Sequence, residues 1–381
     1  MLEENPFLFG KVAAQDRFCN RKKELQELKT YLKDGKNVWL YSPRRFGKTS
    51  LVKKVFSEFD SSNFNAAYLD IFDTQSPQDF TLSFVKATVN SISDRIEKVI
   101  DFAKKTFSYL APKIALSDEG KPEIQFGVNS SSLTDVSLDE VMGIMSDMVS
   151  KKKLKLVIAI DEFQQISQYE NSNAFLAKLR KHIQSQEKIA YVFMGSQRHL
   201  MQDIFTSKKK PFYQSAIPFQ IGSIQPEELA KSLVNLTCKT NHPFTDDLAL
   251  KTAQITGGHP YHTEKLASFA YQLFDHISEF KKIDEYLEFV QNQVIEQEES
   301  IYKNYFNLLT INQRNVLIAI ADFNGKIPSN DMVREYGLSS RQYLEKSLKF
   351  LIEKELIDET DNGICIYDLF FKRWLSRKHK K

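Results

Sequence analysis

Residues 42–49 read Ser42-Pro43-Arg44-Arg45-Phe46-Gly47-Lys48-Thr49. This stretch matches the pattern G-x-x-x-x-G-K-[ST] at every fixed position except the first, where Ser42 replaces glycine. A short apolar run, Val38–Tyr41, precedes it, and apolar residues at helical spacing follow it from Thr49 to Phe59. The strand, loop and helix that the pattern requires are therefore all indicated, which predicts a phosphate-binding P-loop.

The chemistry of such a loop depends on its backbone, whose N–H groups point at phosphate oxygens at the positive end of a helix. Lys48 would reach the β- and γ-phosphates, and Thr49 would place its hydroxyl on Mg²⁺. Gly47 allows close backbone approach, whereas Ser42 adopts a positive φ less readily than glycine. An accidental Gly-Lys-Thr on a loop is the competing interpretation. We expect the residues around bound ATP to be Ser42, Pro43, Arg44, Arg45, Phe46, Gly47, Lys48, Thr49 and Ser50.

A second apolar run ends in two acids: residues 156–160 are followed by Asp161 and Glu162. Charge at the end of a buried strand is costly unless something offsets it, and Mg²⁺ would do so. We expect Asp161 to hold the metal through water, and Glu162 to orient or deprotonate the attacking water. Acids that are simply solvated at the edge of the sheet are the alternative.

A third strand, expected at residues 189–194, leads into Gly195 and Ser196. A polar group there would lie beside the γ-phosphate, between the first two motifs. We predict that Ser196 senses this phosphate and contributes to catalysis with Lys48 and Glu162, and Arg198 is a second candidate. A loop-capping role fits either Ser196 or Arg198 alone equally well.

The order of apolar runs predicts the fold class. Strands are expected at residues 38–41, 66–71, 154–160, 189–194 and 217–221. Continuous apolar runs of this length, separated by helices, indicate a parallel sheet covered on both faces. We predict an α/β fold with a parallel five-stranded sheet and helices on both faces. An insertion is expected at about 73–153, with a small hairpin arm formed by residues 123–128.

Strand signals stop after Gly222, and Pro226 suits the first position of a helix. The segment that follows predicts a helical lid, and residues 291–300 make a polar connector. From Thr310 onward, three helices and a short β pair are typical of a winged helix. We expect three domains, with boundaries at 1–223, 224–299 and 300–381.

Taken together, these motifs resemble the AAA+ superfamily, and more narrowly the archaeal/bacterial ATPase group within the STAND NTPases. The resemblance covers nearly the whole chain and implies an AAA+-like P-loop sheet, a helical lid and a C-terminal winged helix. It implies an ATP-binding, Mg²⁺-dependent ATPase. The residues that carry it are Asn5-Pro6-Phe7, Phe18-Cys19-Asn20-Arg21, Pro43–Leu51, Ile160-Asp161-Glu162-Phe163-Gln164, Gly195-Ser196 and Thr256-Gly257-Gly258-His259-Pro260-Tyr261.

The resemblance also implies nucleotide contacts outside the P-loop. The segment from Phe18 to Arg21 would lie against the adenine, and His259 and Pro260 would approach the base and phosphates from the lid. Without the family, Asn20 is simply a helix N-cap and His259-Pro260 is simply a helix start. Both interpretations stay open.

One position departs from the family pattern. Relatives often carry arginine after the tyrosine in the segment matching residues 211–214, and here it is Gln214. An arginine finger typically raises the rate by about 10³–10⁵. Arg180, Arg198 and the run Lys208–Lys210 are substitutes that the sequence does not rank. The departure favours slow turnover, with the nucleotide acting as a switch.

Composition excludes several classes of protein. The 52 Lys+Arg nearly balance the 49 Asp+Glu, which excludes a polyanion binder that relies on bulk charge but not one that uses a local patch. Three widely spaced cysteines form no CxxC pair, which argues against zinc or redox chemistry. No apolar run is long enough to span a membrane, and the N-terminus lacks the order of a signal peptide. We expect a cytoplasmic protein without a membrane partner.

Two further functions stay open beside the ATPase switch. The expected recognition helix, residues 339–353, offers cations to DNA, and the C-terminal tail is basic, which fits an ATP-regulated transcriptional regulator or mobile-element accessory. Equally, the winged helix could pack internally. The helix residues concerned are Arg341, Gln342, Lys346 and Lys349.

The segment 112–132 could contact a protein partner in a non-enzymatic signalling or defence switch, and a homo-oligomer is equally open.

Overall fold

The computed structural model describes residues 5–10, 21–60, 63–92, 110–116, 122–128, 137–152, 154–322, 335–337, 340–360 and 363–378. The chain divides into two compact units. The sheet unit comprises residues 12–222. The helical unit comprises residues 223–381 together with residues 1–11.

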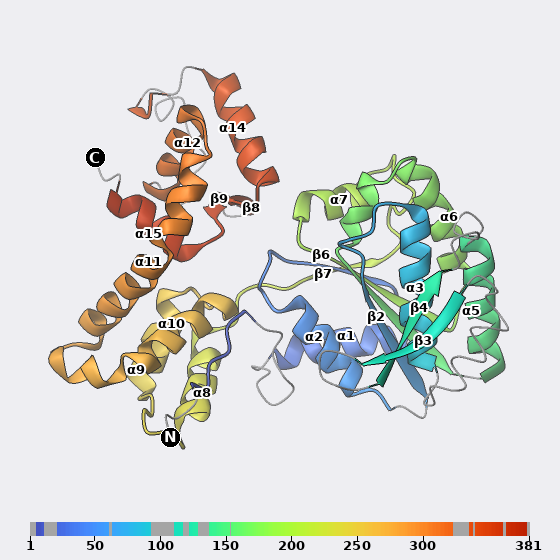
Figure 1. Cartoon of the computed structure of the whole chain (residues 1–381), viewed down its shortest axis with the longest axis horizontal. Helices are drawn as coiled ribbons and strands as arrows, with labels where there is room; N and C mark the ends of the chain where they lie inside the picture. Colours follow the sequence, from blue (N-terminus) through green and yellow to red (C-terminus); the bar gives the residue numbers. More distant parts are fainter. Residues whose placement is uncertain are drawn as a thin grey trace. The chain divides into compact units, whose positions relative to one another are not determined.

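The sheet unit is built on five strands in the order β2-β5-β6-β1-β7. Figure 1 labels β2, β6 and β7 of this sheet. Every neighbouring pair is parallel. Strand β6 lies between β1 and β5, so the carboxyl ends of these three strands meet at one edge of the sheet. The strands are β1 (Val38–Tyr41), β2 (Phe64–Asp70), β5 (Lys155–Asp161), β6 (Ile189–Gly195) and β7 (Ile217–Gln220).

Helices cover both faces of this sheet because its side chains alternate between two apolar clusters. Val38 and Leu40 of β1 pack in one cluster with helices α1 (Lys22–Lys33) and α2 (Lys48–Ser57). Trp39 packs on the opposite face. The helices on that face are α3 (Pro77–Ile92), α5 (Leu138–Lys152), α6 (Ser172–Gln184) and α7 (Arg198–Thr206). The predicted α/β fold with a parallel five-stranded sheet is confirmed.

The expected insertion contains a separate antiparallel hairpin, formed by β3 (Leu110–Leu116) and β4 (Pro122–Val128). This confirms the hairpin arm predicted at residues 123–128. The other residues of the 112–132 segment lie outside the described part of the chain.

The helical unit has one continuous apolar core. Residues near the N-terminus belong to it: the Phe7 ring lies 5.6 Å from Phe244, and the Asn5 amide donates to the Ser268 carbonyl at 3.1 Å. The first helices are α8 (Pro226–Thr237), α9 (Asp246–Ile255) and α10 (Pro260–Gln272), followed by the 3₁₀ turn η3 (Phe274–Glu279) and the 25-residue helix α11 (Ile283–Asn307).

The same core continues into the C-terminal part of the unit. It is formed by α12 (Ile311–Asp322), α14 (Arg341–Glu353), α15 (Leu369–Lys378) and the hairpin of β8 (Ile357–Thr360) and β9 (Gly363–Ile366). The predicted winged helix is confirmed, whereas the three domain boundaries stay a prediction. None of the described helices combines the length and the apolar composition that crossing a membrane requires.

Candidate nucleotide-binding site

The P-loop joins β1 to α2, and carbonyl groups of the loop accept hydrogen bonds from the Lys48 side chain. Gly47, directly before the helix, has a φ of 87°, and Arg45 has a φ of 65°. Ser42 is not among the described residues with positive φ, so serine meets no backbone penalty at the position where the pattern has glycine. The Lys48 ammonium is buried and donates to the carbonyl oxygens of Ser42 and Pro43, at 2.8 and 3.1 Å.

The other predicted loop residues lie on either side of this lysine. Arg44 and Arg45 are exposed, and Phe46 is half-buried. Ser50 lies in the first turn of α2. The geometry therefore places two guanidinium-bearing side chains in solvent directly before the helix N-terminus, where the backbone already favours anions.

Asp161 connects the P-loop to the end of β5. The Thr49 hydroxyl donates to Asp161 Oδ2 at 3.0 Å, and the Glu162 N–H donates to Oδ1 at 2.9 Å. Tyr68 OH also donates to Oδ2. Asp161 is only 6% exposed, so these donors offset the desolvation of its carboxylate. Two residues predicted from separate motifs, Thr49 and Asp161, are thus brought into direct contact.

Tyr68 was not predicted from the sequence. It lies on β2, whose register with β5 pairs Tyr68 with Ala159 and Asp70 with Asp161. Burial, together with the charge of Asp161, raises the pKa of the Tyr68 hydroxyl, which therefore stays a proton donor. Burial also raises the pKa of Asp70, and the charges of Asp161 and Glu162 add to this effect. Only the strand order places these groups together.

Glu162 is held by two side chains. The Ser196 hydroxyl donates to Glu162 Oε2 at 2.8 Å, and the Gln164 amide donates to the same oxygen. Glu162 itself has a left-handed backbone, with a φ of 54°. The structure thus brings together the predicted Glu162 and Ser196, and adds Gln164, which the sequence-based roles did not include.

Gly195 leaves room for the contact between Gln164 and Glu162. A Cβ atom at Gly195 would lie 2.4 Å from Gln164 Oε1 and 2.5 Å from Met201 Sδ. Glycine is therefore required at the end of β6 for Gln164 to reach Glu162. Arg198, the second candidate for phosphate sensing, begins α7 and places its guanidinium 5.8 Å from the centre of the Tyr41 ring at the end of β1.

The oxygen atoms at this edge fit Mg²⁺. The metal prefers carboxylate and hydroxyl oxygens, usually one or two from the protein, with water and substrate phosphates supplying the rest. Thr49 and Asp161 provide such a pair within 3.0 Å of each other. No cluster of three or more His, Cys, Asp or Glu is found in the described part of the chain.

Arg21 does not extend outward toward a ligand. It is 4% exposed, and its guanidinium donates to the carbonyl oxygens of Phe46 and Gly222, at 3.0 and 2.8 Å. It also pairs with Glu24 at 3.1 Å. Arg21 therefore ties the P-loop to the residues after β7. Its predicted contact with the nucleotide stays a prediction, and residues 18–20 lie outside the described part of the chain.

His259 and Pro260 lie in the helical unit, at the start of α10. The His259 side chain accepts from the His262 N–H at a long 3.5 Å, and the Thr263 hydroxyl donates to the His259 carbonyl at 2.8 Å. Pro260 is the first residue of the helix. His259 and Pro260 therefore form the start of a helix, as the simpler interpretation of the sequence predicted. A nucleotide contact by these two residues stays a prediction.

Comparison with known families agrees with this geometry. Residues 18–266 match the model of an ATPase domain predominantly from Archaea, and residues 300–377 match a probable winged helix domain. These matches confirm the archaeal-type ATPase domain and the C-terminal winged helix that the motifs indicated, whereas the narrower placement among the STAND NTPases stays a prediction. No curated protein sequence matches the chain significantly.

Solved structures share the fold at low sequence identity. The Walker-type ATPase paby2304 of Pyrococcus abyssi is 17% identical, with a TM-score of 0.65 and coverage of 98% of this chain and 99% of that one. The ORC2 protein of Aeropyrum pernix, solved in ADPNP–ADP complexes, is 13% identical, with a TM-score of 0.59 and coverage of 99% and 96%. At these identities the likeness shows the fold alone.

Proposed function

Because the chain belongs to the family of ATPase domains found predominantly in Archaea, we propose that it binds ATP with Mg²⁺, hydrolyses it slowly and responds to its nucleotide state as a conformational switch. The observation that carries this proposal is the contact between Thr49 and Asp161 at 3.0 Å. Two polar residues from distant motifs meet at the carboxyl edge of the sheet, beside the helix N-terminus that begins with Lys48.

Each residue of this edge has a role in the proposed reaction. Lys48 binds the β- and γ-phosphates, exchanging its contacts with the loop carbonyls for phosphate oxygens. Thr49 and Asp161 hold Mg²⁺, which supplies charge neutralisation at the phosphates. Glu162 orients the attacking water, and Ser196 keeps the Glu162 carboxylate in place and lies next to the transferred phosphate.

Two observations support slow turnover. The carboxylate of Glu162 is engaged by both Ser196 and Gln164, so contact with a water molecule competes with existing hydrogen bonds. The segment after α7 carries Gln214 instead of an arginine that would stabilise charge in the transition state. Both features are expected to slow hydrolysis.

The continuous core of the helical unit supports the switch. Because the lid helices and the winged helix share one apolar core, they are expected to respond to nucleotide as a single body. ATP and ADP would then change the relation between the sheet unit and the helical unit, rather than the packing of the winged helix on the lid.

Two substitutions test the proposal. Lys48→Ala should abolish tight ATP binding, because it removes the ammonium group proposed to bind the β- and γ-phosphates. Glu162→Gln should retain binding but lose hydrolysis, because the amide cannot accept the proton of water. Lys54→Ala, on the same helix, is the control. Calorimetry for binding and phosphate release for turnover distinguish the variants, and parental behaviour of both would overturn the assignment.

ATP-regulated DNA binding through the winged helix is a second candidate. Helix α14 exposes Arg341, Gln342, Lys346 and Lys349, as the recognition-helix prediction requires. Arg341 pairs with Glu345 at 3.2 Å, which leaves Lys346 as the most available of these cations for a phosphate. Duplex binding that weakens with salt and on Arg341→Gln and Lys346→Gln substitution would support this candidate, and no binding at low salt would exclude it.

A further inference from the structure

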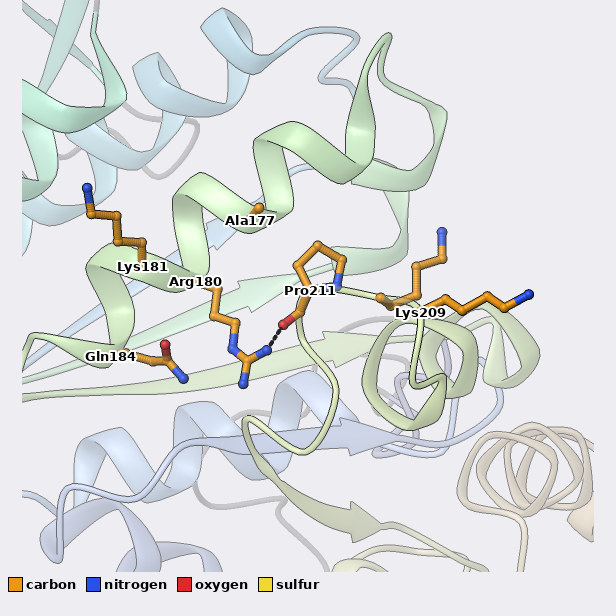
Figure 2. Close-up of a pocket in the computed structure, with 7 residues that line it drawn as sticks. Ala177, Arg180, Lys181, Gln184, Lys209 and Pro211 are labelled. Atoms are coloured by element: carbon orange, nitrogen blue, oxygen red, sulfur yellow. Dashed lines mark hydrogen bonds between the residues drawn. The ribbon is translucent and has the colours of Figure 1, made fainter.

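A hollow of about 450 Å³ opens on the sheet unit between helix α6 and the turn that follows α7 (Figure 2). Four of its seven lining residues are cationic and none is acidic. Figure 2 shows Lys181 and Lys209 on opposite sides of the hollow, with Arg180 and Pro211 between them. We define the basic strip as Arg180, Lys181, Lys208, Lys209 and Lys210.

The strip is a local separation of charge in a nearly neutral chain. Residues 171–186 contain Lys178, Arg180 and Lys181 but no Asp or Glu, and residues 204–226 contain Lys208–Lys210 but no Asp or Glu. The chain as a whole has 52 basic and 49 acidic residues. Two segments without acids, brought together by the fold, produce a cluster of basic side chains that the overall composition does not reveal.

Most of this charge is not neutralised within the protein. Lys178 pairs with Asp139 at 2.7 Å, and Lys210 pairs with Asp203 at 3.4 Å. Within the described part of the chain, Arg180, Lys181, Lys208 and Lys209 have no acidic partner. The three lysines are exposed. These four cations are therefore available to an external anion.

Arg180 is held in one orientation by neutral groups. Its Nη1 donates to the Pro211 carbonyl, and the Gln184 amide, with its oxygen turned toward the guanidinium, accepts from Nε at 3.1 Å. These contacts leave the positive charge of Arg180 uncompensated. A guanidinium that is already oriented loses less conformational entropy when it binds a phosphate group.

The lining residues indicate which anion fits. The hollow has no aromatic side chain, so it offers no ring on which an unpaired base or a free nucleotide could stack. A duplex presents its phosphates outward and keeps its bases stacked inside, so cations alone suffice to bind it. Cations on two sides of a hollow suit a backbone that carries successive phosphates.

We propose that the basic strip binds the sugar–phosphate backbone of duplex DNA without sequence preference. This surface lies in the sheet unit and is distinct from the exposed face of α14 in the helical unit. The proposal does not depend on ATP hydrolysis, because in the described part of the chain no strip residue contacts Lys48, Thr49, Asp161 or Glu162. The role of Arg180 and Lys208–Lys210 as substitutes for an arginine finger stays a separate prediction.

The test compares two triple variants of the full chain with equal loss of charge. The strip variant carries Lys181→Gln, Lys208→Gln and Lys209→Gln. The control carries Lys22→Gln, Lys23→Gln and Lys33→Gln, which are exposed lysines of α1. Binding to a mixed-sequence DNA duplex and to a single strand of equal length is measured by fluorescence anisotropy over a range of salt concentrations, together with ATP turnover.

We expect the strip variant to bind the duplex about tenfold or more weakly at low salt, because three phosphate contacts are lost. The slope of log K against log salt should fall by about 3. The control should change both quantities much less. Equal behaviour of the two variants, no duplex binding by the parent, or a preference of the parent for the single strand would overturn the proposal.

ATP turnover separates the proposal from a contact between copies of the chain. If the strip variant keeps duplex binding but loses turnover, the strip acts at such a contact and the proposal is wrong. If it loses duplex binding and keeps basal turnover, the proposal is supported. A loss of duplex binding confined to Arg341→Gln and Lys346→Gln would assign the DNA contact to α14 instead.

Discussion

The P-loop and the turn before α10 have the same local design in different units. Each contains a glycine with positive φ, Gly47 at 87° and Gly258 at 71°. Each leads into a helix, and each helix carries a buried lysine, Lys48 or Lys265, which are 7% and 2% exposed. The two regions nevertheless differ in what surrounds the glycine and the lysine. This difference distinguishes the P-loop, a candidate binding site, from the turn before α10, whose contacts stabilise the fold.

The glycines differ in the space around them. A Cβ atom at Gly47 would meet no described atom within 4 Å, whereas one at Gly258 would lie 1.9 Å from the Ile224 carbonyl oxygen. Gly258 also accepts from the Ile224 N–H at 2.9 Å. The P-loop glycine therefore leaves open space at a helix N-terminus, and the α10 glycine is required because another segment packs against it.

The lysines differ in their partners. Lys48 donates to two backbone carbonyls, which carry no formal charge. Lys265 pairs with Glu298 of α11 and lies 5.3 Å from the centre of the Phe370 ring of α15. Tyr302 also donates to Glu298. Lys265 thus joins the lid to the winged helix, whereas Lys48 lies in the first turn of α2, where we propose that phosphates bind.

The largest expected effect is that of Lys265→Met on folding. Removing one partner leaves Glu298 without its cation in a mostly buried setting, which should lower the free energy of unfolding by about 3–5 kcal/mol. Lys48→Met should cost much less stability and mainly weaken ATP binding. Urea unfolding checks both. The double variant Lys265→Met/Glu298→Gln should recover part of the loss, and equal destabilisation by the two lysine substitutions would contradict the comparison.

Gly258→Ala should destabilise the helical unit by about 2–4 kcal/mol, because it combines a positive φ with a clash against backbone. Gly257→Ala is the matched control, since Gly257 has a φ of 60° but open space around its Cβ position. It should cost only the backbone strain, about 1 kcal/mol. Thermal unfolding measures the difference, and similar values for both alanines would show that the contact with Ile224 is not required.

Tyr68→Phe tests the region around Asp161. Without the phenol, Asp161 loses one of its hydrogen-bond donors, and Mg²⁺ affinity in the presence of nucleotide should fall about 10–100-fold. ATP binding without metal should stay unchanged. Tyr41→Phe, whose hydroxyl donates to Gln220 at 3.2 Å, serves as the control. Titration calorimetry with Mg²⁺ measures the effect, and equal metal affinity in parent and Tyr68→Phe would remove the role given to this tyrosine.

The smallest expected effect concerns the cap of α10. His259→Ala should cost about 1 kcal/mol or less of stability through its N-cap, and Thr245→Ala, the cap of α9, should cost a similar amount. If the lid contact holds, only His259→Ala should also weaken ATP binding. Equal ATP affinity of the two variants would leave His259 with a capping role alone.

Much of the site could be predicted because its motifs are local. Gly47, Lys48 and Thr49 are adjacent in sequence. Asp161 and Glu162 directly follow an apolar run, so the sequence alone places both acids at the carboxyl end of a strand. Tyr68 and Gln164 could not be assigned roles in this way. Tyr68 contacts Asp161 only because β2 pairs with β5 in one register, and Gln164 reaches Glu162 only where Gly195 leaves room.

The sequence by itself determined the α/β class, the P-loop, the acidic pair and the winged helix, because periodicity and short spacings encode local structure. Only the tertiary structure decided the strand order that brings Thr49 to Asp161, and the use of Arg21 to tie the P-loop to Gly222. It also decided that two segments without acids form one basic strip. These features depend on contacts between residues far apart in the chain, which local patterns do not specify.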